Sequence, residues 1–240
     1  MPPLERLACE WCQSQNPTGS TSCQSCGAPL DVKNLVSDSG WREAPRLRDM
    51  TRVHFGNSTC QVDGEIVPAF EVNLADGESV YFEHHVLLWK EARVPTAVLP
   101  LTGMMKRLLA GMPLVITPVT GPGRAAFARD ATGELVLMPL HPGTELDVRE
   151  HAFVLASRSI DFSYVRIKGL RNILFGGQGM YMDRFVATDA PGLLVLHGYG
   201  NVFERRLAAG ESILVEPGAF LYKDASVTMQ VANPQYADVP

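Results

Sequence analysis

The chain has 240 residues, of which 46% are hydrophobic and 20% are charged, as in an ordinary globular protein. Its formal net charge of -5 provides no positive field for nucleic acid or an anionic membrane surface, so we do not expect nucleic acid as a partner. No apolar run approaches the roughly 20 residues of a membrane-spanning helix, and the first residues show neither a secretory signal nor a transit peptide, which predicts a cytoplasmic protein without a membrane span.

Four of the five cysteines fall within the first 26 residues and form two Cys-x-x-Cys pairs. The predicted metal ligands are Cys9, Cys12, Cys23 and Cys26. The loop between Cys12 and Cys23 lets the two pairs meet tetrahedrally around one ion, and four thiolates suit Zn²⁺. A thioredoxin-type redox site would instead need a single pair within a βα pattern. The sequence therefore predicts a structural Zn²⁺ site, because four protein ligands leave no position open for catalysis.

The spacing around these cysteines resembles two known zinc modules. Asn16, which follows Cys12 after three intervening residues, matches the Ran-binding-protein-2-type zinc finger, although Leu7 stands where that type usually has Trp. The segment after Cys26 is similar to a short zinc ribbon. Members of the finger type bind single-stranded RNA or ubiquitin, but RNA recognition needs Arg or aromatic groups. Trp11 is the only aromatic residue between the outer cysteines, so we expect docking onto protein, with Trp11 either contacting the partner or packing over the metal site.

The chain divides into three parts by its pattern of residues. Residues 1–30 form the expected zinc finger or ribbon, residues 31–50 a mixed polar linker, and residues 51–240 a β domain. Trp41 is a candidate anchor between the linker and that domain. Short segments with period-two alternation, such as Phe70 to Leu74, are separated by Gly- and Pro-containing turns, which is typical of an all-β sandwich, prism or barrel. The one helix candidate is Met104 to Ala110.

A repeat runs through the β domain. Residues 70–92 match residues 203–225 without a gap, and residues 136–157 form a weaker middle copy. Gly77, Gly143 and Gly210 occupy the same place in the three copies, and this predicts matching turns because Gly adopts positive φ without steric cost. The sequence therefore predicts an all-β fold of stacked antiparallel sheets with an approximate internal threefold repeat, preceded by a small zinc-binding module.

Five segments of the β domain resemble the altered-inheritance-of-mitochondria protein 24 family. The most specific of them is the Leu-Phe-Gly-Gly-x-Gly run that begins at Leu174, in which Gln178 stands where the family usually has Glu. The others are Gly77 to Val80, Pro142-Gly143, Ala152 to Ser157, and Gly210 to Phe220. The resemblance implies a fold grouped with tryptophan RNA-binding attenuator-like β proteins, and it implies homo-oligomers. It implies no established activity and no catalytic residues.

The remaining reactive side chains do not form a recognisable catalytic set. His84 and His85 are adjacent, so on a strand they point to opposite faces, while His151 and His197 each stand alone in the sequence. Cys60 is expected to be a partly buried thiol. The Gly-rich run at residues 176–179 lacks the Lys-Ser/Thr of a phosphate-binding loop. We therefore expect no catalytic residues, no organic cofactor and no enzymatic activity.

These observations lead to one leading hypothesis and one alternative. The leading hypothesis is a non-enzymatic, oligomeric β scaffold whose structural zinc finger docks an unidentified protein partner. The scaffold would associate with itself as a homo-oligomer, for which a trimer is one candidate. The alternative is a ligand- or RNA-binding oligomer of the attenuator-like type.

Overall fold

The computed structural model describes residues 6–9, 11–12, 14–17, 20–28, 30, 40–43, 52–83, 85–97, 116–167 and 181–230. Within this part of the chain the regular structure is β-strand, apart from one short 3₁₀ turn, η1 (Pro217–Ala219). The strands form three larger antiparallel sheets and two small two-stranded ribbons. The expected all-β class with stacked antiparallel sheets is thus confirmed.

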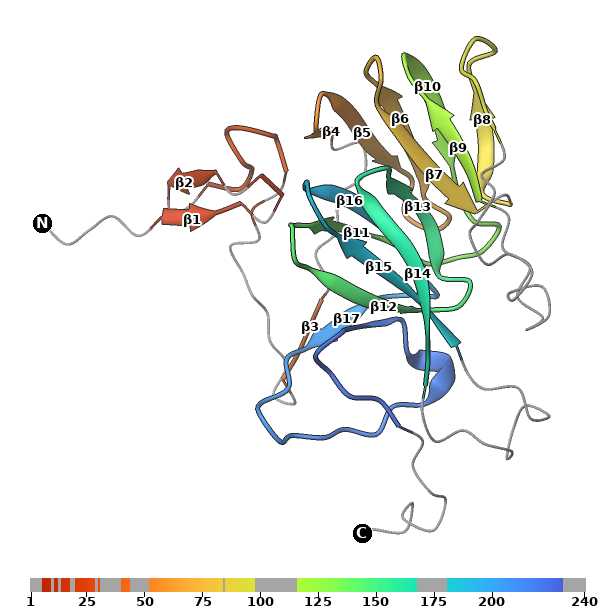
Figure 1. Ribbon diagram of the computed structural model, residues 1–240. Coiled ribbons are helices and arrows are strands. Elements are labelled where there is room, and N and C mark those ends of the chain that lie inside the picture. Colours follow the sequence, from red (N-terminus) through yellow and green to blue (C-terminus); the bar gives the residue numbers. More distant parts are fainter. Residues whose placement is uncertain are drawn as a thin grey trace, which may run out of the picture.

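The three larger sheets follow one another from the top to the bottom of Figure 1. The first has the order β4 (Arg52–Phe55), β5 (Ser58–Asp63), β6 (Ala69–Leu74), β10 (Gly123–Phe127), β8 (Leu87–Lys90). The second has the order β11 (Glu134–Leu140), β16 (Gly192–Gly198), β13 (Phe153–Ser157), β7 (Ser79–Glu83), β9 (Ile116–Thr120). The third has the order β14 (Ile160–Arg166), β15 (Tyr181–Ala187), β12 (Glu145–Arg149), β18 (Tyr222–Asp224).

The two ribbons lie outside these sheets. In one, β1 (Arg6–Ala8) pairs with β2 (Gln15–Pro17) beside the cysteines. In the other, β3 (Trp41–Glu43) pairs with β17 (Phe203–Arg205), and Trp41 lies opposite Arg205. Because β3 falls within the expected linker, at least this part of the linker is paired with the β domain.

Two layers of hydrophobic core hold the sheets together. The first layer packs residues of the first sheet, such as Phe70, against residues of the second sheet, such as Leu155. The second layer packs the opposite face of the second sheet against the third sheet, where Phe153 contacts Phe185 with ring centroids 4.9 Å apart. The second sheet is therefore buried on both faces, which explains why β16 reads as an unbroken apolar run, Leu193 to Leu196, rather than an alternating one.

Similar turns occur at the three glycines that the sequence aligns. Gly77, Gly143 and Gly210 have φ of 75°, 88° and 80°. Each lies in a turn closed by the same backbone hydrogen bond: Glu78 N to Ala75 O (3.2 Å), Thr144 N to His141 O (2.9 Å), and Glu211 N to Ala208 O (3.0 Å). A second turn recurs in each copy, after the segment that follows the glycine. Its backbone hydrogen bond runs from Val86 N to Glu83 O, from Ala152 N to Arg149 O, and from Ala219 N to Glu216 O. The prediction of matching turns at matching glycines is confirmed.

Strand pairing also recurs from one copy to the next. The order β6-β10-β8 in the first sheet has the same form as β11-β16-β13 in the second. Likewise, the order β13-β7-β9 in the second sheet has the same form as β18-β12-β15 in the third. The register is preserved as well, since Gly123 lies opposite Leu74 and Gly192 lies opposite Leu140. A rotation that relates all three copies stays a prediction.

Some expected features fall outside the described residues. These are the helix candidate Met104 to Ala110 and the Leu-Phe-Gly-Gly-x-Gly run that begins at Leu174. In the part of the chain that is described, no helix has the length and apolar character needed to cross a membrane.

Candidate metal centre

The four N-terminal cysteines converge on one point. Their sulfur atoms all lie within 4.8 Å of one another, with 3.7 Å between Cys9 and Cys26 and 3.6 Å between Cys12 and Cys23. A tetrahedral ion with metal–sulfur bonds of about 2.3 Å requires sulfur atoms about 3.8 Å apart. The donor set is therefore compatible with a four-thiolate metal site at the positions predicted from the sequence.

Backbone hydrogen bonds hold each pair of cysteines in a turn. The N–H of Cys9 donates to Ser14 O at 2.9 Å, which closes the first turn. In the second turn the N–H of Gly27 donates to Cys23 O at 2.9 Å, and the N–H of Cys23 donates to Ala28 O. Gly27 has φ of 81°, a conformation in which a side chain is strained. The glycine directly after Cys26 thus allows the chain to turn back beneath the sulfurs.

Two polar residues that the sequence did not identify as part of the site support the sulfurs. The Ser14 hydroxyl lies 2.8 Å from Cys12 Sγ and 3.1 Å from Cys23 Sγ. The buried Asn16 side chain donates to Ser14 O at 2.9 Å and accepts from the N–H of Gln24 at 2.9 Å, so it ties the two turns together. The sequence distinguishes Asn16 only by its spacing from Cys12, and nothing in the sequence reveals that Ser14 faces both sulfurs.

These surroundings shift the pKa values of the four thiols in two opposite directions. Burial opposes ionisation of Cys23, but hydrogen bonds from Ser14 and from backbone N–H groups outweigh it and lower the pKa of this thiol to about 5. The pKa of Cys12 is also lowered, because the Ser14 hydrogen bond outweighs burial. Burial raises the pKa of both Cys9 and Cys26. A cation between the sulfurs would offset this desolvation, which is the condition under which four thiolates are stable together.

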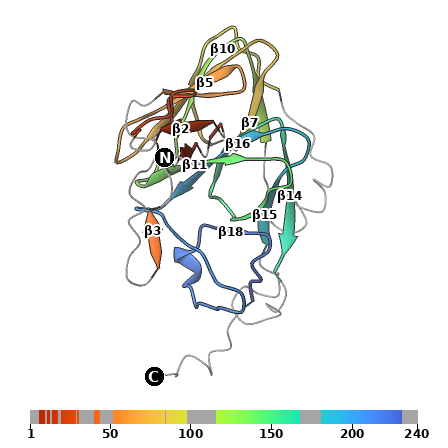
Figure 2. The same cartoon turned by 90° about the vertical axis from the view of Figure 1, so that its left-hand side faces the viewer.

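The cysteine module is packed against the β domain. Cys9, Cys23 and Cys26 belong to the same buried cluster as Val53 in β4, and Figures 1 and 2 show the module beside the first and second sheets. A Cβ added at Gly27 would lie only 3.1 Å from the carbonyl oxygen of Arg52, so the two backbones approach closely there.

Trp11 lies at the border of this packed cluster. Its side chain is half-buried and packs against the cluster, as expected if it packs over the metal site. Cys12 is the exposed member of the four cysteines. The outward side of the module is therefore the turn that carries Cys12.

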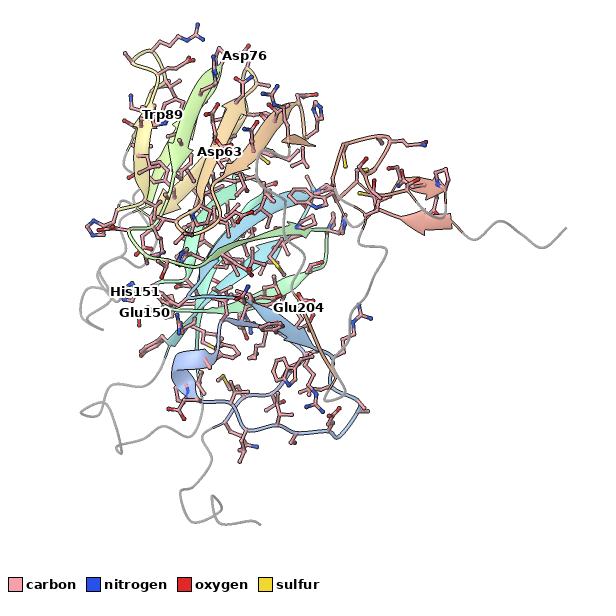
Figure 3. The ribbon with its side chains drawn as sticks, turned by 180° about the vertical axis from the view of Figure 1, so that it is seen from behind. Asp63, Asp76, Trp89, Glu150, His151 and Glu204 are labelled. Carbon is pink, nitrogen blue, oxygen red and sulfur yellow. The ribbon has the colours of Figure 1, made fainter. Side chains whose placement is uncertain are left out.

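The other sequence candidates lie apart from the cysteines. Cys60 is buried in the first core layer and burial raises its pKa, as expected for an unreactive thiol. His85 is exposed and His197 is buried, while His84 and the Gly-rich run at residues 176–179 lie outside the described residues. His151 is exposed, as Figure 3 shows, with φ of 65° and its Nδ1 3.5 Å from Glu83 Oε1.

The structure also reveals a buried charged group that sequence reasoning missed. Asp147 is 1% exposed and accepts hydrogen bonds from Arg184 Nε (2.7 Å) and Nη2 (3.0 Å) and from Lys223 Nζ (2.6 Å). Burial opposes ionisation of Asp147, but the two cations outweigh it and lower its pKa. The three residues lie side by side on β12, β15 and β18. Their proximity depends on strand register, so no local sequence signal could have revealed it.

Comparison with known proteins identifies the family. A search of curated proteins finds no match. A crystal structure of a Streptococcus pyogenes protein is similar at 19% sequence identity with a TM-score of 0.45, over 60% of this chain and 65% of that chain. The model of the family described as mitochondrial biogenesis AIM24 matches residues 60–237, the family expected from the sequence motifs. The chain therefore belongs to the AIM24 mitochondrial biogenesis family.

Proposed function

We propose that this protein is a non-enzymatic, oligomeric β scaffold whose N-terminal module holds a structural Zn²⁺ and docks a protein partner. The observation that carries the proposal is the closed set of four sulfurs within 4.8 Å of one another. Zn²⁺ is the ion expected for four thiolates, because it imposes no geometry of its own and does no redox chemistry. With four protein ligands no position remains for substrate or activated water, which supports a structural role.

The β domain supports the scaffold role through its layered architecture. Two of its buried carboxylates are engaged in ion pairs: Asp147 pairs with Arg184 and Lys223, and Glu83 pairs with Arg129. Apolar side chains nevertheless remain on the surface, among them Trp89 at 44% and Leu214 at 76% exposed. Exposed strand edges and apolar side chains suit association with further chains better than chemistry on a small substrate.

Partner docking is tested by affinity capture from native cell extract with two baits. One bait is the intact chain, and the other carries Cys9→Ser and Cys12→Ser. A protein that binds only the intact bait would support recruitment by the cysteine module. A third bait with Cys60→Ala controls for loss of a thiol elsewhere, because Cys60 lies in the core of the β domain. Identical companions on all three baits would contradict the docking role and assign binding to the β domain.

The alternative function, a ligand- or RNA-binding oligomer of the attenuator-like type, is favoured by one surface feature. A polar hollow of about 270 Å³ lies on the first sheet, and Arg52 and Arg124 contribute to its lining. Arg124 lies 3.8 Å from Glu71 and 3.5 Å from Glu91, so its charge is largely offset by neighbouring carboxylates. Fluorescence anisotropy with a labelled single-stranded RNA at several salt concentrations tests this function, since phosphate binding weakens steeply as salt rises.

A further inference from the structure

The third copy of the repeat contains a segment that has the sequence of an inner strand but pairs with no strand in the described part of the chain. Residues 212–216 match β7 of the first copy position by position, from Ser79 aligned with Ser212 to Glu83 aligned with Glu216. Their counterpart in the second copy is β12. Among the described residues, 212–216 pair with no strand, although the turns before and after them are the same as in the other copies.

The two counterparts show what this segment lacks. Both β7 and β12 are inner strands, β7 between β13 and β9 and β12 between β18 and β15. In β7, Tyr81 is 7% and Phe82 is 1% exposed. In the unpaired segment the equivalent residues, Leu214 and Val215, are 76% and 37% exposed. The same pattern of residues is thus left in solvent without the backbone and side-chain partners that bury it in the first copy.

The repeat also identifies the missing partner. On one side, β7 pairs with β13 of the second copy, and β12 pairs with β18 of the third. Each inner strand therefore pairs with the corresponding strand of the following copy. No fourth copy follows the third within the repeat, so the next copy in the cycle is the first. The strand of the first copy that corresponds to β13 and β18 is β8. Within the described residues β8 pairs only with β10, and it forms the edge of the first sheet. Leu88 is 56% exposed, and Figure 3 shows Trp89 at this edge.

One chain does not make this pairing with itself. In Figure 1, β8 lies at the top of the stack of sheets, whereas η1, which directly follows the unpaired segment, lies at the bottom. We propose that residues 212–216 of one copy of the chain pair antiparallel with β8 of a second copy, and so extend its first sheet by one strand. This inference rests on the proposed function and deepens it, because it assigns the surfaces through which the scaffold assembles.

The register of this pairing follows from the two observed examples. Tyr81 lies opposite Ala156, and its counterpart Asp147 lies opposite Lys223. In the gapless match, Leu214 corresponds to Tyr81 and Lys90 corresponds to Lys223. Leu214 of one copy is therefore expected opposite Lys90 of the next, and Val215 opposite Trp89. The second pair places an aromatic side chain directly opposite a β-branched one, and cross-strand pairs of this kind stabilise sheets.

The two surfaces are different, so the contact is head to tail. An interface between different patches generates a ring if the rotation closes and an open filament if it does not. Main-chain hydrogen bonds to an exposed edge strand supply the affinity in such assemblies, and the side chains supply the register. A closed ring is consistent with the homo-oligomer expected for this family from the sequence resemblance.

Cross-linking between copies tests the register. A full-length chain carrying Trp89→Cys and Val215→Cys is treated with a short bifunctional thiol reagent, because residues directly opposite have Cβ atoms about 4.5–5.5 Å apart. The expected result is a ladder of covalent multimers on a denaturing gel, which neither single variant gives. The matched control pairs Trp89→Cys with Leu214→Cys, whose side chain points to the opposite face of the strand, and it is expected to give no ladder.

Each outcome of this test has a distinct meaning. An equal ladder from the control would overturn the proposed register. No ladder from a protein whose native mass is multimeric would overturn the strand pairing but leave the oligomeric scaffold in place. A native mass of one chain would overturn both.

A second variant removes the backbone donor. Leu214→Pro eliminates an N–H that makes no hydrogen bond within the described residues of one copy. In both observed pairs the backbone at alternate positions of the inner strand faces the partner, as in Arg158 N to Ser79 O and Arg149 N to Leu221 O, and Leu214 falls on one of these positions. The variant is expected to convert the multimer to single chains, measured by light scattering, with an unchanged circular dichroism spectrum. A multimer that persists with Leu214→Pro would contradict the proposal.

Discussion

At the scale of single residues, the cysteine module depends on side chains with two kinds of role. The four cysteines supply the sulfurs, while Ser14 and Asn16 hold the two turns together. The cysteines could be predicted because their spacing is a property of the local sequence. Ser14 could not, because its position between Cys12 and Cys23 exists only after the two turns have met.

Replacement of one metal ligand should remove the ion and leave the β domain folded. Cys23→Ser is expected to reduce bound Zn²⁺, measured by elemental analysis, from one ion to none per chain. In small modules of this kind metal binding supplies the folding energy, so amides of the first ~30 residues should lose protection in hydrogen exchange. Cys60→Ala is the control, and it should retain the ion. Loss of protection throughout the β domain would show that the module is not a separate folding unit.

Removal of the buried carboxylate should destabilise the third sheet. Asp147→Ala leaves Arg184 and Lys223 without their shared partner, and breaking a buried ion pair costs about 3–5 kcal/mol. The measurement is the free energy of unfolding from urea denaturation. Glu145→Gln is the matched control on the same strand, because Glu145 is more exposed and lies 3.5 Å from the same arginine. Its replacement should cost about 0–1 kcal/mol, and an equal cost for both variants would contradict this account.

The buried His197 should make stability depend on pH. Its pKa is lowered from 6.5 by burial, with Arg129 and Arg149 adding repulsion. As the pH falls below about 6.5 the unfolded chain takes up a proton that the folded chain resists, so stability should fall. Urea midpoints at pH 7.5 and 5.5 should differ more for the wild-type chain than for His197→Gln. The exposed His85→Gln is the control, and it should keep the wild-type difference.

At the scale of elements, the repeated turns were the most predictable part of the fold. Gly77, Gly143 and Gly210 all adopt positive φ in hydrogen-bonded turns, as their equivalent positions indicated. Strand partners were less predictable, because pairing joins residues far apart in the chain. The β3–β17 pair, for example, places Trp41 opposite Arg205, and no periodicity connects those segments.

Alanine at the turn glycines should cost a similar amount in each copy. A Cβ at Gly77 or Gly143 would meet nothing within 4 Å, so the cost comes only from the left-handed backbone, roughly 1–2 kcal/mol. Gly218→Ala is the matched control, since its surroundings are equally open and its φ is not in the left-handed region. Urea denaturation of the three variants measures these costs. A neutral Gly77→Ala together with a costly Gly218→Ala would contradict the assignment of the turns.

At the scale of the whole molecule, the sequence predicted the class and the family but not the order of the sheets. The all-β fold and the AIM24 family are confirmed because turn residues and family motifs are local. The second sheet escaped prediction because it is buried on both faces, so Tyr81 and Glu83 lie inside although alternation would place them on a polar face. Which segments meet across a stack of sheets is decided by long-range packing.

Native mass spectrometry of the full chain tests the central claim most directly, because one spectrum reports both the number of chains and the number of bound ions. The account predicts a defined multimer that carries one Zn²⁺ per chain. A folded single chain that retains no zinc would contradict both the structural metal site and the oligomeric scaffold.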